Sequence, residues 1–170
     1  MVTLNDLPLI KSDNNVVSPS FYIYSPITRE LNDKQESSET VTGSESILIV
    51  DDDDIQRLVS SILLKKQGYK VSTAESGEEA VEFFHKNSCD LVILDMVMPG
   101  GIDGAETYRQ ILEISSPQKA IVLSGFSGTD RVLKAQSLGA GAFVQKPLTR
   151  KAIATAVRTE LDRAREVVTS

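Results

Sequence analysis

Acidic side chains gather directly behind an apolar run in the stretch ILIVDDDDIQR, which extends from Ile47 to Arg57. Neighbouring carboxylates repel one another, and a carboxylate without a partner resists leaving water. Either these aspartates form a solvated turn at the start of a helix, or a positively charged group belongs among them. The second alternative is a metal site, because carboxylate oxygens are the ligands that a hard cation such as Mg²⁺ prefers.

Other apolar runs also end in residues that can do chemistry. Asp95 ends LVILD, Ser124 ends AIVLS, and Lys146 follows AFVQ. Two unit charges in contact interact by roughly 4 kcal/mol at an effective dielectric constant of about 20, so clustered carboxylates need a cation or a proton. These strand-end residues therefore predict a binding site for a divalent cation at Asp51 and Asp52. Asp95 would be free to act as a nucleophile toward phosphorus. A metal and Lys146 would neutralise the phosphoryl group that arrives there.

These residues meet only if the runs before them are strands of one parallel sheet. We expect strands over residues 47–51, 69–73, 91–95, 120–124 and 142–145. Amphipathic stretches with a helical period lie between them. Strands that alternate with helices at this spacing favour βαβ units and one parallel sheet with helices on both faces. The carboxyl ends of such strands share one rim, and ligands gather there.

Capping residues and apolar faces predict where the helices lie. Helix starts are expected at Asp53 or Asp54, Ser76, Asp103 and Thr149, and helix ends at Gly68 and Gly139. The first helix has an apolar face of Ile55, Leu58, Val59, Ile62 and Leu63, and the last has one of Ile153, Ala156, Val157, Leu161 and Ala164. Such a face is typical of an amphipathic helix that packs on a core.

Composition limits the functions that are open to the chain. The formal net charge of −6 disfavours general nucleic-acid binding, which needs a basic face. A single histidine and a single cysteine, Cys89, exclude a His/Cys metal cluster and an internal disulfide. No apolar run is long enough to span a bilayer, and no signal-peptide pattern occurs. We therefore expect a cytoplasmic protein without a membrane or nucleic-acid partner.

The first 45 residues differ from the rest. They are rich in polar and acidic residues, and LNDKQESSETVTGSES has almost nothing to bury. We expect residues 1–45 to form a flexible, mostly disordered acidic extension and residues 46–168 to form the folded domain. One island within the extension, PSFYIYSPITRE, holds a short aromatic run of β type that ends at a proline.

Four pieces of the sequence together resemble the response-regulator receiver domain, the phosphoacceptor module of two-component signalling. They are ILIVDDDD, LVILDMVMPGGIDG, AIVLSGF and GAGAFVQKP, in the order and approximate spacing of that family. The resemblance implies a flavodoxin-like (βα)5 fold, a doubly wound five-stranded parallel sheet of order 2-1-3-4-5. Residues 7–30 resemble the end of a histidine-kinase ATP-binding domain. The chain is thus similar to the C-terminal receiver of a hybrid sensor histidine kinase.

The resemblance implies a role for each rim residue. Asp95 accepts the phosphoryl group as an acyl phosphate. Asp52 and Asp95 bind Mg²⁺ together with the backbone carbonyl of Val97, and Asp51 assists. Lys146 pairs with the phosphoryl oxygens.

A switch between two conformations is also implied. Ser124 fills the position of a hydroxyl that moves to the phosphoryl group, and Phe143 fills the aromatic position that swings inward with it. The output face comprises the fourth helix, the fifth strand and the last helix. The bond between Lys146 and Pro147 is expected to be cis. One departure is the loop Met98-Pro99-Gly100-Gly101-Ile102-Asp103-Gly104, which is one residue longer than the usual M-P-x-x-D-G.

Three functions remain open from the sequence. The first is a phosphoacceptor that takes phosphate from a histidine kinase or a histidine phosphotransfer protein. It would not be an enzyme beyond self-phosphorylation from small donors and slow autodephosphorylation. The second is a phosphohydrolase with an aspartate nucleophile, which commonly needs Asp-x-Asp where Val97 stands here. The third is a pseudo-receiver, a protein-binding module that is not phosphorylated, against which the complete set of rim residues argues.

Overall fold

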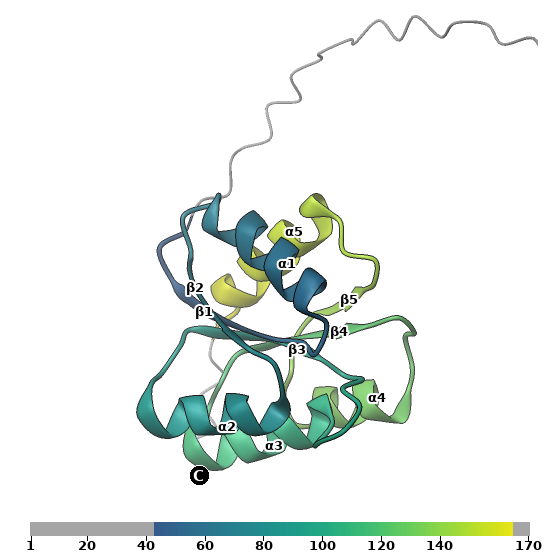
Figure 1. Ribbon diagram of the computed structural model, residues 1–170. Helices are drawn as coiled ribbons and strands as arrows, with labels where there is room; N and C mark the ends of the chain where they lie inside the picture. The colour runs from purple at the N-terminus through teal and green to yellow at the C-terminus, as the bar shows by residue number, and fades with distance from the viewer. Residues whose placement is uncertain (1–42, 165–170) are drawn as a thin grey trace, which may run out of the picture. The chain divides into compact units, whose positions relative to one another are not determined.

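Five strands and five helices alternate along the part of the chain that the computed structural model describes, residues 43–164 (Figure 1). The elements are β1 (Ser46–Val50), α1 (Asp54–Lys65), β2 (Lys70–Ala74), α2 (Gly77–Lys86), β3 (Leu91–Asp95), α3 (Gly104–Ile114), β4 (Ala120–Ser124), α4 (Asp130–Ser137), β5 (Phe143–Gln145) and α5 (Arg150–Asp162). The predicted extension and its kinase-like island fall almost entirely on residues 1–42, outside the described residues.

The strands form one parallel sheet in the order β2-β1-β3-β4-β5, so the flavodoxin-like prediction is confirmed. Each predicted strand lies within one residue of the observed one. Strand β1 sits between β2 and β3, where Ile47 is in register with Val71 on one side and Leu91 on the other. This order places the ends of β1 and β3 next to each other.

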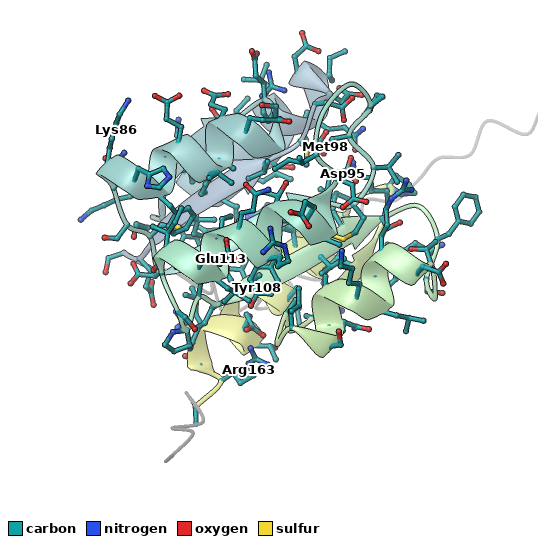
Figure 2. All side chains as sticks on the ribbon, turned by 90° about the horizontal axis from the view of Figure 1, so that it is seen from below. Lys86, Asp95, Met98, Tyr108, Glu113 and Arg163 are labelled. Carbon is teal, nitrogen blue, oxygen red and sulfur yellow. The ribbon has the colours of Figure 1, made fainter. Side chains whose placement is uncertain are left out.

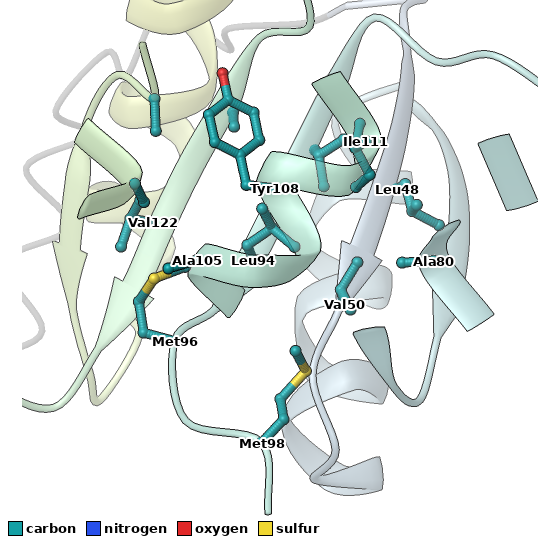
Figure 3. Close-up of a cluster of buried hydrophobic side chains, with 14 of the residues drawn as sticks. Leu48, Val50, Ala80, Leu94, Met96, Met98, Ala105, Tyr108, Ile111 and Val122 are labelled. Atoms are coloured by element: carbon teal, nitrogen blue, oxygen red, sulfur yellow. The ribbon is translucent and has the colours of Figure 1, made fainter. Parts of the chain in front are cut away.

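Both faces of the sheet are covered, which explains why the central strands β1, β3 and β4 are apolar without alternation. Helices α1 and α5 lie on one face and α2, α3 and α4 on the other (Figure 1). Successive strand residues point to opposite faces, so Leu48 and Val50 belong to one buried cluster and Ile47 and Ile49 to the other. Figure 3 shows the first cluster, where Ala105, Tyr108 and Ile111 of α3 gather over the strands.

The expected helix signals match the observed termini. Asp53, Ser76, Asp103 and Thr149 each cap a helix by accepting a hydrogen bond from a backbone N–H in its first turn. Gly68 and Gly139 follow α1 and α4 with φ of 96° and 102°, the left-handed region that glycine adopts without strain. The sequence reading missed the cap of α4, Thr129, whose side chain accepts from the N–H of Val132. Among the described residues, no helix is long and apolar enough to cross a bilayer.

Helix α1 does not bury the apolar face that its sequence predicted. Ile55, Leu58, Val59 and Ile62 remain 68%, 60%, 46% and 44% exposed. The side of α1 that meets the sheet carries Ser60, Ser61 and Leu64 instead. Of the predicted face, only Leu63 is partly buried and packs against the cluster that contains Leu64. We call the four exposed residues the α1 stripe.

Contacts with the domain begin before residue 46. The N–H of Gly43 donates to the carbonyl of Gln67 at 3.0 Å, and the N–H of Lys70 donates to the carbonyl of Glu45 at 2.9 Å. The Glu45 carboxylate also pairs with Arg158 of α5 at 2.9 Å. The last residues of the expected extension therefore join the end of α1 to α5.

Gly104 offers a test of how closely α3 approaches the end of β3. A Cβ at this position would collide with the backbone carbonyl of Asp95, whereas a Cβ at Gly125 would meet nothing. We expect Gly104→Ala to lower the free energy of unfolding by about 1–3 kcal/mol, since the backbone must move. Gly125→Ala should stay within about 0.5 kcal/mol of the wild type. Urea unfolding of both variants measures the difference, and equal stabilities would contradict the packing described here.

Candidate functional site

Three carboxylates and one ammonium meet at the carboxyl rim of the sheet. The Nζ of Lys146 lies 2.8 Å from Oδ2 of Asp51 and 2.6 Å from Oδ2 of Asp95. Asp52 completes the group, because one carboxylate oxygen from each of the three aspartates lies within 4.8 Å of the others. The structure thus brings together the four charged residues that the sequence predicted for one rim.

The strand order explains this convergence. Asp51 follows β1 and Asp95 ends β3. Because these two strands are neighbours in the sheet, the two aspartates lie side by side. Lys146 follows β5, which is separated from β3 by β4, and its long side chain spans that gap. The peptide bond between Lys146 and Pro147 is cis, as expected.

Burial and charge act against each other in this group. Asp51 is almost fully buried, and loss of water raises the pKa of its carboxyl, although Lys146 partly offsets the effect. Burial also acts to lower the pKa of Lys146, but its hydrogen bonds to Asp51 and Asp95 outweigh burial and the net shift is upward. Lys146 is therefore held as a cation between two carboxylates.

The group has the composition of a binding site for a hard dication. Three carboxylates and one ammonium leave two formal negative charges in a small volume. Asp52 is exposed, so its oxygens are accessible to an ion that arrives from solvent. Mg²⁺ takes oxygen ligands, usually one or two carboxylates with water and phosphate oxygens. Asp51, Asp52 and Asp95 fit that ion, and its charge would balance the excess.

Ser124 ends β4 at the rim, and Phe143 starts the adjacent strand β5, in register with Val122. Ser124 is buried, and its Oγ accepts a hydrogen bond from the N–H of Phe126 at 3.3 Å. The backbone N–H of Lys146 donates to the carbonyl of Ser124 at 3.0 Å, so a hydrogen bond joins the end of β4 to the residue that follows β5. Phe143 is half-buried and packs against the cluster beneath α3 and α4. The hydroxyl hydrogen of Ser124 remains available for another acceptor.

The lengthened loop after β3 is fastened to α2. Oε1 of Glu78 accepts a hydrogen bond from the backbone N–H of Ile102 at 2.9 Å, and this bond holds the pKa of Glu78 below its usual value. Gly100, within this loop, has a φ of 93°, a left-handed conformation that favours glycine. Figure 2 shows Asp95 and Met98 at the end of α3 where this loop enters the helix. The insertion is thus accommodated without moving Asp95 off the rim.

Sequence reasoning missed one residue that supports the rim. Nη1 of Arg57 donates to the backbone carbonyl of Asp51 at 2.6 Å. The available signal was its position in the first turns of α1, six residues after Asp51, but that turn also carries Gln56 and Leu58. Only the packing of α1 on the sheet shows which of these side chains turns back toward β1.

Comparison with known proteins identifies the class to which this fold and rim belong. The sequence model of the response regulator receiver domain matches residues 47–158. The chain belongs to this family, whose members are signalling domains of two-component systems.

Relatives with different architectures share this domain. The chemotaxis protein CheY of Bacillus subtilis is 33% identical over 117 residues, which cover 68% of this chain and 97% of CheY. The transcriptional regulatory protein AfsQ1 of Streptomyces coelicolor is 32% identical over 118 residues, covering 69% of this chain and only 52% of AfsQ1. The chain thus spans about half the length of AfsQ1.

A solved structure and a sensor kinase extend the comparison. The N-terminal domain of a response regulator/sensory box/GGDEF 3-domain protein from Carboxydothermus hydrogenoformans superimposes with a TM-score of 0.63 at 32% identity, covering 68% of this chain and 93% of that one. The sensor kinase CckA of Brucella abortus is 30% identical over 132 residues, which cover 76% of this chain and 14% of CckA. The similarity to receivers of sensor kinases is therefore confirmed.

The lysine bridge predicts a strong and pH-dependent loss of stability in Lys146→Ala. This change leaves two buried carboxylates without their cation and should lower the free energy of unfolding by about 3 kcal/mol at pH 7, the lower end for buried pairs, because the lysine keeps some exposure. The loss should shrink as the pH falls from neutral through the pKa of Asp51, which burial raises above its usual value, because protonation of that carboxyl relieves the repulsion.

The matched control is Lys86→Ala, which removes an ion pair with the same 2.6 Å separation. Lys86 and Glu82 are about two-thirds exposed, so water already solvates both charges. Urea unfolding at several pH values measures both variants. Similar losses for the two lysines would show that burial of the rim pair contributes nothing.

Proposed function

We propose that this chain is a phosphoacceptor receiver that takes a phosphoryl group onto Asp95 from a histidine kinase or a histidine phosphotransfer protein in the cytoplasm. The observation that supports it best is the Lys146 ammonium, which contacts the carboxylates of Asp51 and Asp95 beside the exposed Asp52. Membership of the receiver family and the similarity to CheY support the same role.

The chemistry follows from the charges on the rim. An Oδ of Asp95 attacks the phosphorus, the P–N bond of the donor phosphohistidine breaks, and its electron pair returns to the imidazole. Mg²⁺ held by Asp51, Asp52 and Asp95, with the carbonyl of Val97, would offset the charge on the transferring group. Lys146 Nζ already lies beside Asp95 and pairs with a phosphoryl oxygen after transfer.

Ser124 and Phe143 form the proposed switch. The Ser124 hydroxyl accepts from Phe126, so it can donate its own hydrogen to a phosphoryl oxygen on Asp95. Movement of Ser124 at the end of β4 frees space beneath β5, and Phe143 at the start of β5 turns inward. The signal then reaches a surface formed by α4, β5 and α5.

Two other functions have less support. A phosphohydrolase would need an acid for the leaving group two residues after the nucleophile, and the exposed Val97 occupies that position. A pseudo-receiver that binds proteins without being phosphorylated would have no need of the buried carboxylate of Asp51 and its partner Lys146, because burying a charge is costly. The proposed protein is thus a signalling domain, and beyond accepting the phosphoryl group from its partner it would catalyse at most self-phosphorylation from small donors and slow autodephosphorylation.

Asp95→Asn tests the acceptor directly. Incubation of the wild type with acetyl phosphate and Mg²⁺ should give one phosphoryl adduct in the intact mass spectrum, and a chelator should abolish it. The adduct should be absent in Asp95→Asn, because an amide oxygen is a poor nucleophile. The control Asp130→Asn changes an exposed aspartate at the start of α4 and should label like the wild type. A folded wild type that takes no adduct, also from a phosphoramidate donor, would favour the pseudo-receiver.

Ser124→Ala separates acceptance from switching. The variant should still form the adduct, while the NMR shifts that phosphorylation or beryllofluoride causes at Phe143 and along α4 should be largely lost. The reason is that no hydroxyl remains to follow the phosphoryl oxygen. Ser127→Ala, which changes an exposed serine three residues later, should keep these shifts. Unchanged shifts in Ser124→Ala would remove the serine from the proposed switch.

A further inference from the structure

The α1 stripe is the largest group of exposed apolar side chains on any one element of the described part. Four of the seven large apolar residues that are exposed there belong to this helix: Ile55, Leu58, Val59 and Ile62. A contiguous apolar patch of this kind marks an interaction surface more often than an isolated exposed leucine does. Helix α1 lies beside α5 on one face of the sheet, so its outer side is open to a partner (Figure 1).

Charges at the two ends of α1 limit which partner fits. Asp54 opens the helix, and Lys65 and Lys66 stand at its end. All three are exposed, and none forms an ion pair with another residue between 43 and 164. The helix therefore presents an apolar centre between an acidic end and a basic end.

The charges and apolar residues of one α1 helix are complementary to those of a second, antiparallel α1 helix. At about 100° per residue, Asp54, Leu58 and Lys65 fall along one edge of the stripe. A twofold axis beside Leu58 and Val59 pairs each end of one helix with the opposite end of a second helix. Asp54 then meets the lysine end of the second copy on the same edge, and the apolar centres face each other. A parallel pair would instead bring like charges together.

We propose that a second copy of this chain docks on the α1 stripe, with the two α1 helices antiparallel about a twofold axis. Such an interface is isologous, so both copies use the same residues and the assembly closes as a dimer. Helix α1 has 12 residues and is about 18 Å long. A stable interface needs about 800 Å² from each partner, and one side of so short a helix supplies less than that. The dimer is therefore weak and dissociates within an accessible range of concentration.

Sedimentation velocity from about 1 µM to about 1 mM, on the full chain, tests the proposal. The wild type should pass from monomer to dimer in this range, and Leu58→Glu should weaken the dimer at least tenfold. The control Leu133→Glu places the same charge at a leucine of similar exposure on α4, 55% against 60% for Leu58, and should dimerise like the wild type. A wild type that stays monomeric throughout, or a dimer that only Leu133→Glu disrupts, would overturn the proposal.

A charge exchange tests the antiparallel arrangement and does not depend on folding defects. Lys65→Glu and Asp54→Lys each place like charges at both ends of the dimer, so each variant alone should dimerise at least fivefold more weakly. An equimolar mixture should recover the wild-type affinity, because each copy then supplies the charge that the other lacks. A mixture that remains monomeric would overturn the antiparallel dimer, and would leave the stripe to a helix of a different protein.

Discussion

The contact of one ammonium with two buried carboxylates organises this molecule. Lys146 reaches Asp51 and Asp95 from the far side of β4, and its ammonium is the positive charge that faces these two buried carboxylates. Without the lysine, two negative charges would face each other in a region from which water is largely excluded. The ends of β1, β3 and β5 are therefore coupled through charge as well as through the backbone.

The sheet supplies the rigidity that this arrangement needs. Its central strands are packed against buried side chains on both faces, which holds their ends in place. The segments that would move in the proposed switch lie in loops, and Ser124 is the last residue of β4, where such a loop begins. In the proposed function, a phosphoryl group on Asp95 redistributes charge at the rim, and Ser124 and Phe143 move in response.

The proposed phosphoryl site and the proposed dimer interface would use different sides of the same short segment. Asp51 and Asp52 lie just before α1, while the α1 stripe begins at Ile55. Arg57 turns back from the same helix to the carbonyl of Asp51. Whatever covers the outer side of α1 therefore lies close to the acidic rim. A dimer through α1 would bring the lysine end of one helix near the acids of the other copy.

The sequence by itself determined the strands, most helix caps and the four charged residues of the rim, because buried strands, caps and strand-end acids depend on local residue type. It did not determine the packing side of α1. The helical period of Ile55, Leu58 and Ile62 predicted a buried face, yet the contact with the sheet uses Ser60, Ser61 and Leu64. The role of Arg57 was hidden for the same reason. Which side of a helix faces the sheet is decided by close packing between segments far apart in sequence, and only the tertiary structure contains that information.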